Sequence, residues 1–146
     1  MLRPTTGSMI ADDLVTREAQ MNILLAYNDS DASNRALERA AQLAGMYEAS
    51  LVVTSITPVL IGAPPETGPG PELRRADERL RELGIEAELV EAIGEIAEAI
   101  VQVAESRNLG LIVLGTREPS QVERMLGHSV SESVQRMAHC DVLIVH

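Results

Sequence analysis

The chain has 146 residues, 45% of them hydrophobic and 23% charged, which suffices for one domain with a single core. All 12 basic residues are arginine, and the 22 acidic residues leave a formal net charge of −10, so the surface repels nucleic acid and anionic membranes alike. The lack of lysine excludes a Walker-type phosphate loop and a Schiff-base mechanism. The chain has two Tyr and neither Phe nor Trp, so it also lacks an aromatic platform for stacked bases.

Residues 1–20 show no strand pattern and only a weak helical one, so we expect an arm, vector-derived or native, ahead of one domain over residues 21–146. The single cysteine, Cys140, cannot form an intramolecular disulfide and fits a reducing compartment. The sequence contains no apolar run of signal-peptide or membrane-spanning length. These features predict a cytoplasmic protein with no nucleic-acid or membrane partner.

The regular pattern begins with NILLAY, residues 22–27, a continuous apolar run typical of a strand buried on both faces. Ser30 or Asp31 then caps a helix that we expect to stop at Gly45. Its apolar stripe consists of Ala36, Leu37, Ala40, Leu43 and Ala44.

A second strand and helix follow. Residues 50–57, SLVVTSIT, are β-branched and apolar, whereas the Pro and Gly of the next segment forbid regular structure before Pro71. Pro71 suits the first turn of a helix that ends before Gly84. The side chains expected on its buried side are Leu73, Ala76, Leu80 and Leu83.

The second half continues the alternation. Residues 85–92 alternate like a strand with one wet face, near a sheet edge, and residues 109–115 predict a fourth strand. Between them a helix begins at Gly94 and turns Ile96, Ile100, Val103 and Ala104 inward. A helix from Ser129 to Ala138 and a strand at residues 141–145 complete the pattern. Such a chain forms a parallel sheet covered by helices on both faces.

Ligands of parallel sheets bind outside the carboxyl ends of the strands, where the strand order reverses. The loops after the first and fourth strands are therefore the candidate sites. After the first strand, Asn28 and Asp29 either meet a ribose or a metal, or form a turn ahead of the helix cap.

The stretch GTREPSQVERMLGHSVSESV, residues 115–134, is the second candidate. Gly115 lets the backbone approach a ligand, and the helix start at Ser129 offers unpaired N–H groups to an anion. Ser129 and Glu132 also form a capping-box pattern that needs no ligand. His128 and His139 lie about three helical turns apart, so they cannot share a metal ion.

From residue 21 onward the chain resembles the universal stress protein family. The resemblance rests on three segments: NILLAYNDSDASNRALERAAQLA, GEIAEAIVQVAESRNLGLIVLGTR and MLGHSVSESVQRMAHCDVLIV. It implies an α/β fold with a five-stranded parallel sheet in the order 3-2-1-4-5, Rossmann-like and similar to the adenine nucleotide alpha hydrolases. It also implies a homodimer formed through residues 141–145. One branch of the family binds adenine nucleotides and the other does not.

Nucleotide-binding members resemble a G-x-x-G…G-[ST] pattern, preceded by an Asp after the first strand. Without gaps, Gly115 and Ser129 match that pattern, Glu118 and His128 replace two glycines, and Asn28 replaces the Asp. A one-residue deletion instead places Gly127 on the third glycine and His128 on the hydroxyl position. In either register, Glu118 lies beside the expected phosphates and repels them.

Other residues favour binding. Asn28 retains an acceptor for a ribose hydroxyl, Ile56 occupies the adenine-contacting position, and Arg117 and Arg124 offset Glu118 if they turn inward. The candidate cofactor-binding residues are Ala26, Asn28, Ile56, Gly115, Arg117, Glu118, Gly127, His128, Ser129 and Val130.

Together these features predict a cytoplasmic, dimeric regulatory or binding module of the stress response, with an unknown protein partner. Its degraded site binds AMP, cAMP or ATP weakly, and the smaller charge of the first two favours them beside Glu118. The alternative is a weak ATP hydrolase or ATP-dependent switch. No catalytic group and no metal site is expected.

Overall fold

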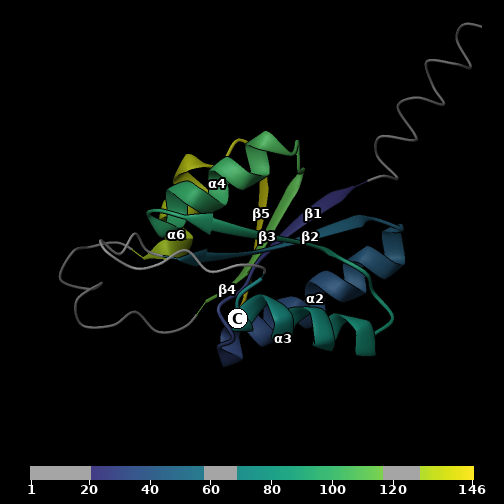
Figure 1. Cartoon of the computed structure of the whole chain (residues 1–146). Coiled ribbons are helices and arrows are strands. Elements are labelled where there is room, and N and C mark those ends of the chain that lie inside the picture. The colour runs from purple at the N-terminus through teal and green to yellow at the C-terminus, as the bar shows by residue number, and fades with distance from the viewer. Residues whose placement is uncertain (1–20, 58–68, 117–128) are drawn as a thin grey trace, which may run out of the picture.

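The computed structural model describes residues 21–57, 69–116 and 129–146 (Figure 1). Strands and helices alternate along this part of the chain: β1 (Asn22–Ala26), α2 (Asp31–Tyr47), β2 (Ser50–Thr57), α3 (Pro71–Glu82), β3 (Glu88–Ile93), α4 (Ile96–Ser106), β4 (Leu111–Gly115), α6 (Val130–Met137) and β5 (Asp141–Val145). All pairings are parallel, and the strand order is β3-β2-β1-β4-β5. The predicted sheet and its order are confirmed.

The helices form a layer on each face of the sheet (Figure 1). Alternate residues of the central strands point to opposite faces, so Ile23 and Leu25 pack under α2 and α3, whereas Leu24 packs under α4 and α6. All three of these side chains are fully buried. This double burial explains why β1 reads as a continuous apolar run rather than as an alternation.

Most element boundaries agree with the sequence pattern, but Gly45 does not end its helix. The helix α2 continues to Tyr47 and closes at Glu48, whose φ of 51° is left-handed and whose N–H donates to the Ala44 carbonyl. An exposed glycine within a helix costs only about 1 kcal/mol, which the continued hydrogen bonds outweigh. The β3 strand begins at Glu88, three residues later than expected, and lies at the sheet edge as predicted.

Two side chains that the helical stripes place inside are exposed. Leu83 is 53% exposed because α3 ends at Glu82, so Leu83 leaves the helical stripe. Ile96 is 45% exposed because it is the first residue of α4, at the edge of the sheet where the strands end. The turn before it uses Gly94 at φ 139°, and the cap of α4 is Glu95 rather than Gly94.

Candidate functional site

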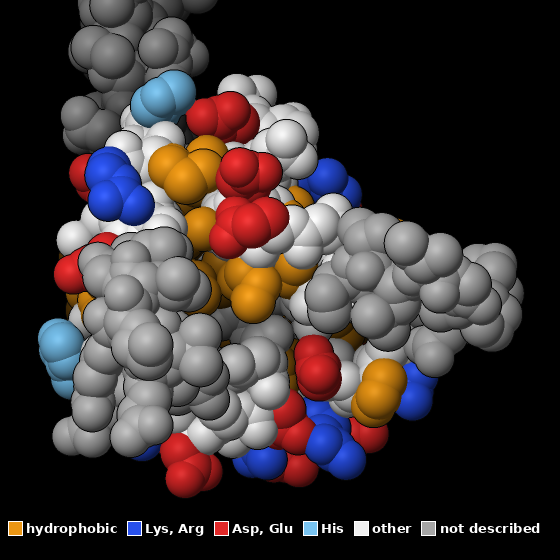
Figure 2. Space-filling view, turned by 90° about the vertical axis from the view of Figure 1, so that its left-hand side faces the viewer, with side chains coloured by type: hydrophobic (Ala, Val, Ile, Leu, Met, Phe, Trp, Pro, Cys, Tyr) orange, Lys and Arg blue, Asp and Glu red, His pale blue; other side chains and the backbone are white. Residues whose placement is uncertain are grey.

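A cavity of about 170 Å³ lies at the carboxyl ends of β1 and β4. From these neighbouring strands the chain crosses to opposite faces of the sheet, since α2 follows β1 and α6 follows β4. This is the switch point at which parallel sheets bind ligands. Figure 2 shows hydrophobic side chains at the centre of this face, with acidic side chains beside them. Six candidate residues line the cavity: Ala26, Asn28, Ile56, Gly115, Ser129 and Val130.

The other four candidates, Arg117, Glu118, Gly127 and His128, lie outside the described residues, and so does Arg124. The proposed effect of Glu118 on phosphates therefore stays a prediction.

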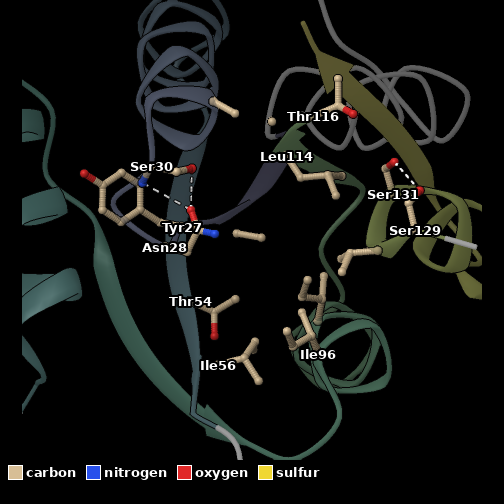
Figure 3. A pocket seen from close by; sticks show the side chains of 15 residues that line it. Tyr27, Asn28, Ser30, Thr54, Ile56, Ile96, Leu114, Thr116, Ser129 and Ser131 are labelled. Carbon is tan, nitrogen blue, oxygen red and sulfur yellow. Dashed lines mark hydrogen bonds between the residues drawn. The ribbon is translucent and has the colours of Figure 1, made fainter. Parts of the chain in front are cut away.

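One side of the cavity is aliphatic. Ile56 from β2 faces Ile96 from α4 (Figure 3). Ile100 and Val130 add further branched side chains to the lining. Sequence reasoning placed Ile56 and Val130 here but assigned the two α4 residues only to the core. Their four-residue spacing puts both on one helical face, and a helix that follows a parallel strand begins at the ligand-binding edge. This spacing and the position of the helix could therefore have identified Ile96 and Ile100 as lining residues from the sequence.

Asn28 lines the cavity, but as a hydrogen-bond donor rather than as the predicted acceptor. Its Oδ1 accepts from the Ser30 N–H (3.2 Å) and from the Ser30 hydroxyl (2.6 Å). A backbone N–H requires an acceptor, so these contacts fix the amide with its oxygen toward Ser30. The side chain therefore offers the cavity its Nδ2 donor, whereas the expected ribose acceptor is already engaged.

Gly115 is required by packing. A Cβ built on it would lie 2.2 Å from the carbonyl oxygen of Ala32 and 2.4 Å from the carbonyl carbon. Ala32 lies in the first turn of α2. The glycine that the sequence assigned to ligand approach therefore lets the end of β4 approach the start of α2.

Three hydroxyls gather at the α6 side of the cavity, from Thr116, Ser129 and Ser131 (Figure 3). Ser129 caps α6 by accepting from the Glu132 N–H at 3.3 Å, and its Oγ lies 3.1 Å from that of Ser131. Ser129 is thus confirmed as the helix cap. The reciprocal capping box occurs instead at α2, where Ser30 and Ser33 bond each other's backbone N–H groups.

Beneath the Asn28 side lies a polar cluster that the sequence analysis did not find. The hydroxyl of Tyr27, a residue only 3% exposed, lies 3.0 Å from Asp29 Oδ1 and 2.5 Å from Asn34 Oδ1. Arg75 of α3 forms an ion pair with the other oxygen of Asp29. Burial and the Asp29 carboxylate raise the pKa of Tyr27 to about 12, and Arg75 lowers the pKa of Asp29.

Within the described ranges, no group of three or more His, Cys, Asp or Glu residues is placed to hold a metal ion. His139 instead lies with its Nδ1 3.1 Å from a carboxylate oxygen of Glu105. Over the same ranges, no helix has the length and apolarity needed to cross a membrane.

The fold and the cavity define a doubly wound α/β domain with a pocket at its switch point. The sequence matches the universal stress protein family over residues 21–146. This chain belongs to that family.

Individual relatives agree. Universal stress protein YxiE of Bacillus subtilis is 34% identical in an alignment that covers 84% of this chain and 97% of the relative. A universal stress protein solved in complex with cAMP is 26% identical, with a TM-score of 0.75 over 88% of this chain and 98% of its own. A universal stress protein from Archaeoglobus fulgidus, solved in complex with dAMP, shares the fold at 22% identity, with a TM-score of 0.64 over 88% and 99% of the two chains.

Proposed function

We propose that this protein is a stress-response binding module that holds an adenine nucleotide of low charge, AMP or cyclic AMP, in the cavity between β1 and β4. The observation that carries the proposal is that the cavity has an aliphatic side and a polar side. An aliphatic wall of Ile56, Ile96 and Ile100 lies opposite the amide and hydroxyl groups at the starts of α2 and α6.

Each wall suits one part of a nucleotide. The branched aliphatic side chains provide an apolar surface for the flat base. The first N–H groups of α6 and the hydroxyls of Ser129 and Ser131 suit a phosphate, because a helix start carries unpaired donors and a partial positive charge. The described lining otherwise contributes neutral side chains, which favours a ligand with one or two negative charges, such as cAMP or AMP, over ATP with about four.

The similar proteins support the same ligand class. The relative with a TM-score of 0.75 was solved with cAMP, and the more distant Archaeoglobus fulgidus protein with dAMP. Both ligands are adenine nucleotides with a single phosphate.

Isothermal titration calorimetry with cAMP, AMP, ADP and ATP tests the proposal. We expect cAMP and AMP to bind more tightly than ATP, and Ser131→Ala to weaken both. Ser133→Ala is the matched control, since it removes the same hydroxyl from the same helix outside the cavity lining. Absence of heat with all four nucleotides at millimolar concentration would reject the proposal. Phosphate release from ATP, followed in parallel, tests the hydrolase alternative.

We further propose a homodimer in the cytoplasm, paired through β5. This strand lies at the sheet edge, and its residues Val142, Leu143, Ile144 and Val145 are only partly buried. Pairing with a second copy would satisfy the edge and cover these side chains.

Analytical ultracentrifugation tests the dimer. We expect a dimer that Ile144→Arg converts to monomer, whereas Ile93→Arg on β3, the opposite edge strand, leaves it intact. Ile93 is the more exposed of the two, at 70%, so it controls for a change in surface hydrophobicity. A wild-type monomer at high micromolar concentration would contradict the proposal.

A further inference from the structure

The loop that carries Asn28 is held from two sides. On the α2 side, the Ser30 N–H donates to Ser33 Oγ at 2.9 Å and the Ser33 N–H donates to Ser30 Oγ at 3.1 Å. On the α3 side, Asp29 contacts both the Tyr27 hydroxyl and the Arg75 guanidinium. Asn28 therefore lies between a helix cap and an ion pair.

Asp29 has a left-handed backbone, with φ at 58°. This conformation is unfavourable for a residue other than glycine, although Asp tolerates it better than most because its short side chain forms local hydrogen bonds. Here the carboxylate bonds are not only local, since Arg75 lies 46 positions further along the chain. The turn that orients Asn28 thus receives part of its stabilisation from α3.

The start of α3 is itself fixed to the sheet. Ser55 of β2 donates to the Glu72 carboxylate at 2.5 Å, and the Gly70 N–H donates to Glu91 of β3. Leu73, Ala76 and Leu80 anchor the same helix in the core. Arg75 consequently extends from a firmly placed helix toward the loop, rather than from a mobile one.

We propose that Arg75 and Asp29 form a positioning pair through which α3 holds the amide of Asn28 with its Nδ2 donor toward the nucleotide. This inference rests on the proposed function and deepens it, because it names the residues that orient the Asn28 amide at the polar side of the cavity. Ligand atoms that reach Asn28, the sugar and phosphate, then depend on α3. The base, which lies on the aliphatic wall, does not.

The Arg75–Asp29 pair is expected to affect ligand affinity rather than the stability of the fold. Arg75 has a 59% exposed side chain, and ion pairs in such positions contribute little to global stability. Arg75→Ala is therefore expected to leave the thermal midpoint almost unchanged. A variant that merely damaged the fold would lower the affinity for every ligand.

The first experiment compares Arg75→Ala with Arg81→Ala by calorimetry against cAMP and free adenine. Arg81 is the matched control, since it lies on the same helix and forms an ion pair with Asp77. We expect Arg75→Ala to weaken cAMP about tenfold, as for the loss of one good hydrogen bond, and to leave adenine unchanged. Equal cAMP affinities in the two variants would overturn the proposal.

Asp29→Gly separates the ion pair from the backbone turn. Glycine adopts the left-handed conformation freely but has no carboxylate. We expect the same loss of cAMP affinity as for Arg75→Ala, and no further loss in the double variant, because both changes remove one interaction. Full affinity in Asp29→Gly would show that the turn alone suffices.

Nuclear magnetic resonance separates this proposal from the proposed function. In the ligand-free protein, Arg75→Ala should shift the Asn28 side-chain amide and the Ser30 backbone amide, whereas Arg81→Ala should not. If wild type binds no nucleotide but these signals move, the proposed function fails and the positioning pair stands. If the signals remain in place, the positioning pair fails whether or not a nucleotide binds.

Discussion

The two polar walls of the cavity differ in how their groups are engaged. At the start of α2, Asn28 bonds the cap residue Ser30, which is fixed in turn by Ser33, and Asp29 is tied to α3. At the start of α6, the Ser129 hydroxyl accepts one long cap bond of 3.3 Å and otherwise contacts the Ser131 hydroxyl, which can rotate. The first wall therefore presents a fixed donor, whereas the second can turn donors or acceptors toward a ligand.

The difference follows from how each wall is anchored. The helix α2 has 17 residues, seven of them buried, and it follows the central strand β1. The helix α6 has eight residues, of which only Val134 is fully buried, and it precedes the edge strand β5. We infer that the α2 wall sets which ligand binds, and that the α6 wall adapts to the ligand's charge.

The largest expected effect concerns the contact between the end of β4 and the start of the α2 wall. Gly115→Val places a branched side chain against the Ala32 carbonyl, which a first-turn backbone atom cannot avoid. We expect a loss of about 3 kcal/mol in unfolding free energy, or failure to fold. Urea denaturation measures it, with Gly110→Ala as control, since a Cβ there meets nothing within 4 Å. A stable Gly115→Val protein would show that the end of β4 does not lie against the start of α2.

The sequence placed Gly115 at the cavity correctly, but it gave only the approach of a ligand as the reason for a glycine and missed the contact with Ala32. A glycine at the end of a parallel strand is visible in the sequence, but the approach of Ala32, 83 positions earlier, depends on how α2 packs on the sheet. By contrast, most helix and strand bounds were predictable from apolar periodicity, and the strand order was implied by the family resemblance.

Asn28 likewise shows that the sequence predicts a position more readily than the contacts of the side chain there. Its position after β1 was predictable, and it lines the cavity. Its role as a donor was not, because that depends on the Ser30 contacts and on the left-handed turn at Asp29. Sequence reasoning therefore located this site better than it described the chemistry.

The next effect tests whether the α2 wall selects the ligand. Asn28→Asp replaces the Nδ2 donor by a charged oxygen, and such a charge about 4 Å from a phosphate costs roughly 1 kcal/mol in water and more near a protein surface. We expect cAMP affinity to fall about tenfold while the affinity for free adenine, which lacks both sugar and phosphate, is retained. Calorimetry measures both ratios. Asn108→Asp adds the same charge outside this cavity and should change neither.

A further effect, on stability rather than on binding, compares the two caps. Ser30→Ala removes the bonds to the Ser33 N–H and to Asn28, whereas Ser129→Ala removes one cap bond of 3.3 Å. We expect a loss of about 2 kcal/mol in unfolding free energy for Ser30→Ala and about 1 kcal/mol or less for Ser129→Ala. Equal losses by urea denaturation would contradict the difference in anchoring.

The last effect appears only at alkaline pH and lies beneath the α2 wall, at Tyr27. Its folded-state pKa of about 12 exceeds the usual value of 10, so the folded state holds the phenol proton longer than the unfolded chain does. That stabilisation is complete below pH 10 and is lost as the pH rises from about 10 to 12. Tyr27→Phe should remove this part of the alkaline decline in unfolding free energy, together with the tyrosinate absorbance that appears near pH 12. If the variant keeps both, the hydroxyl is not held by Asp29, and the α2 wall is less rigid than its contacts indicate.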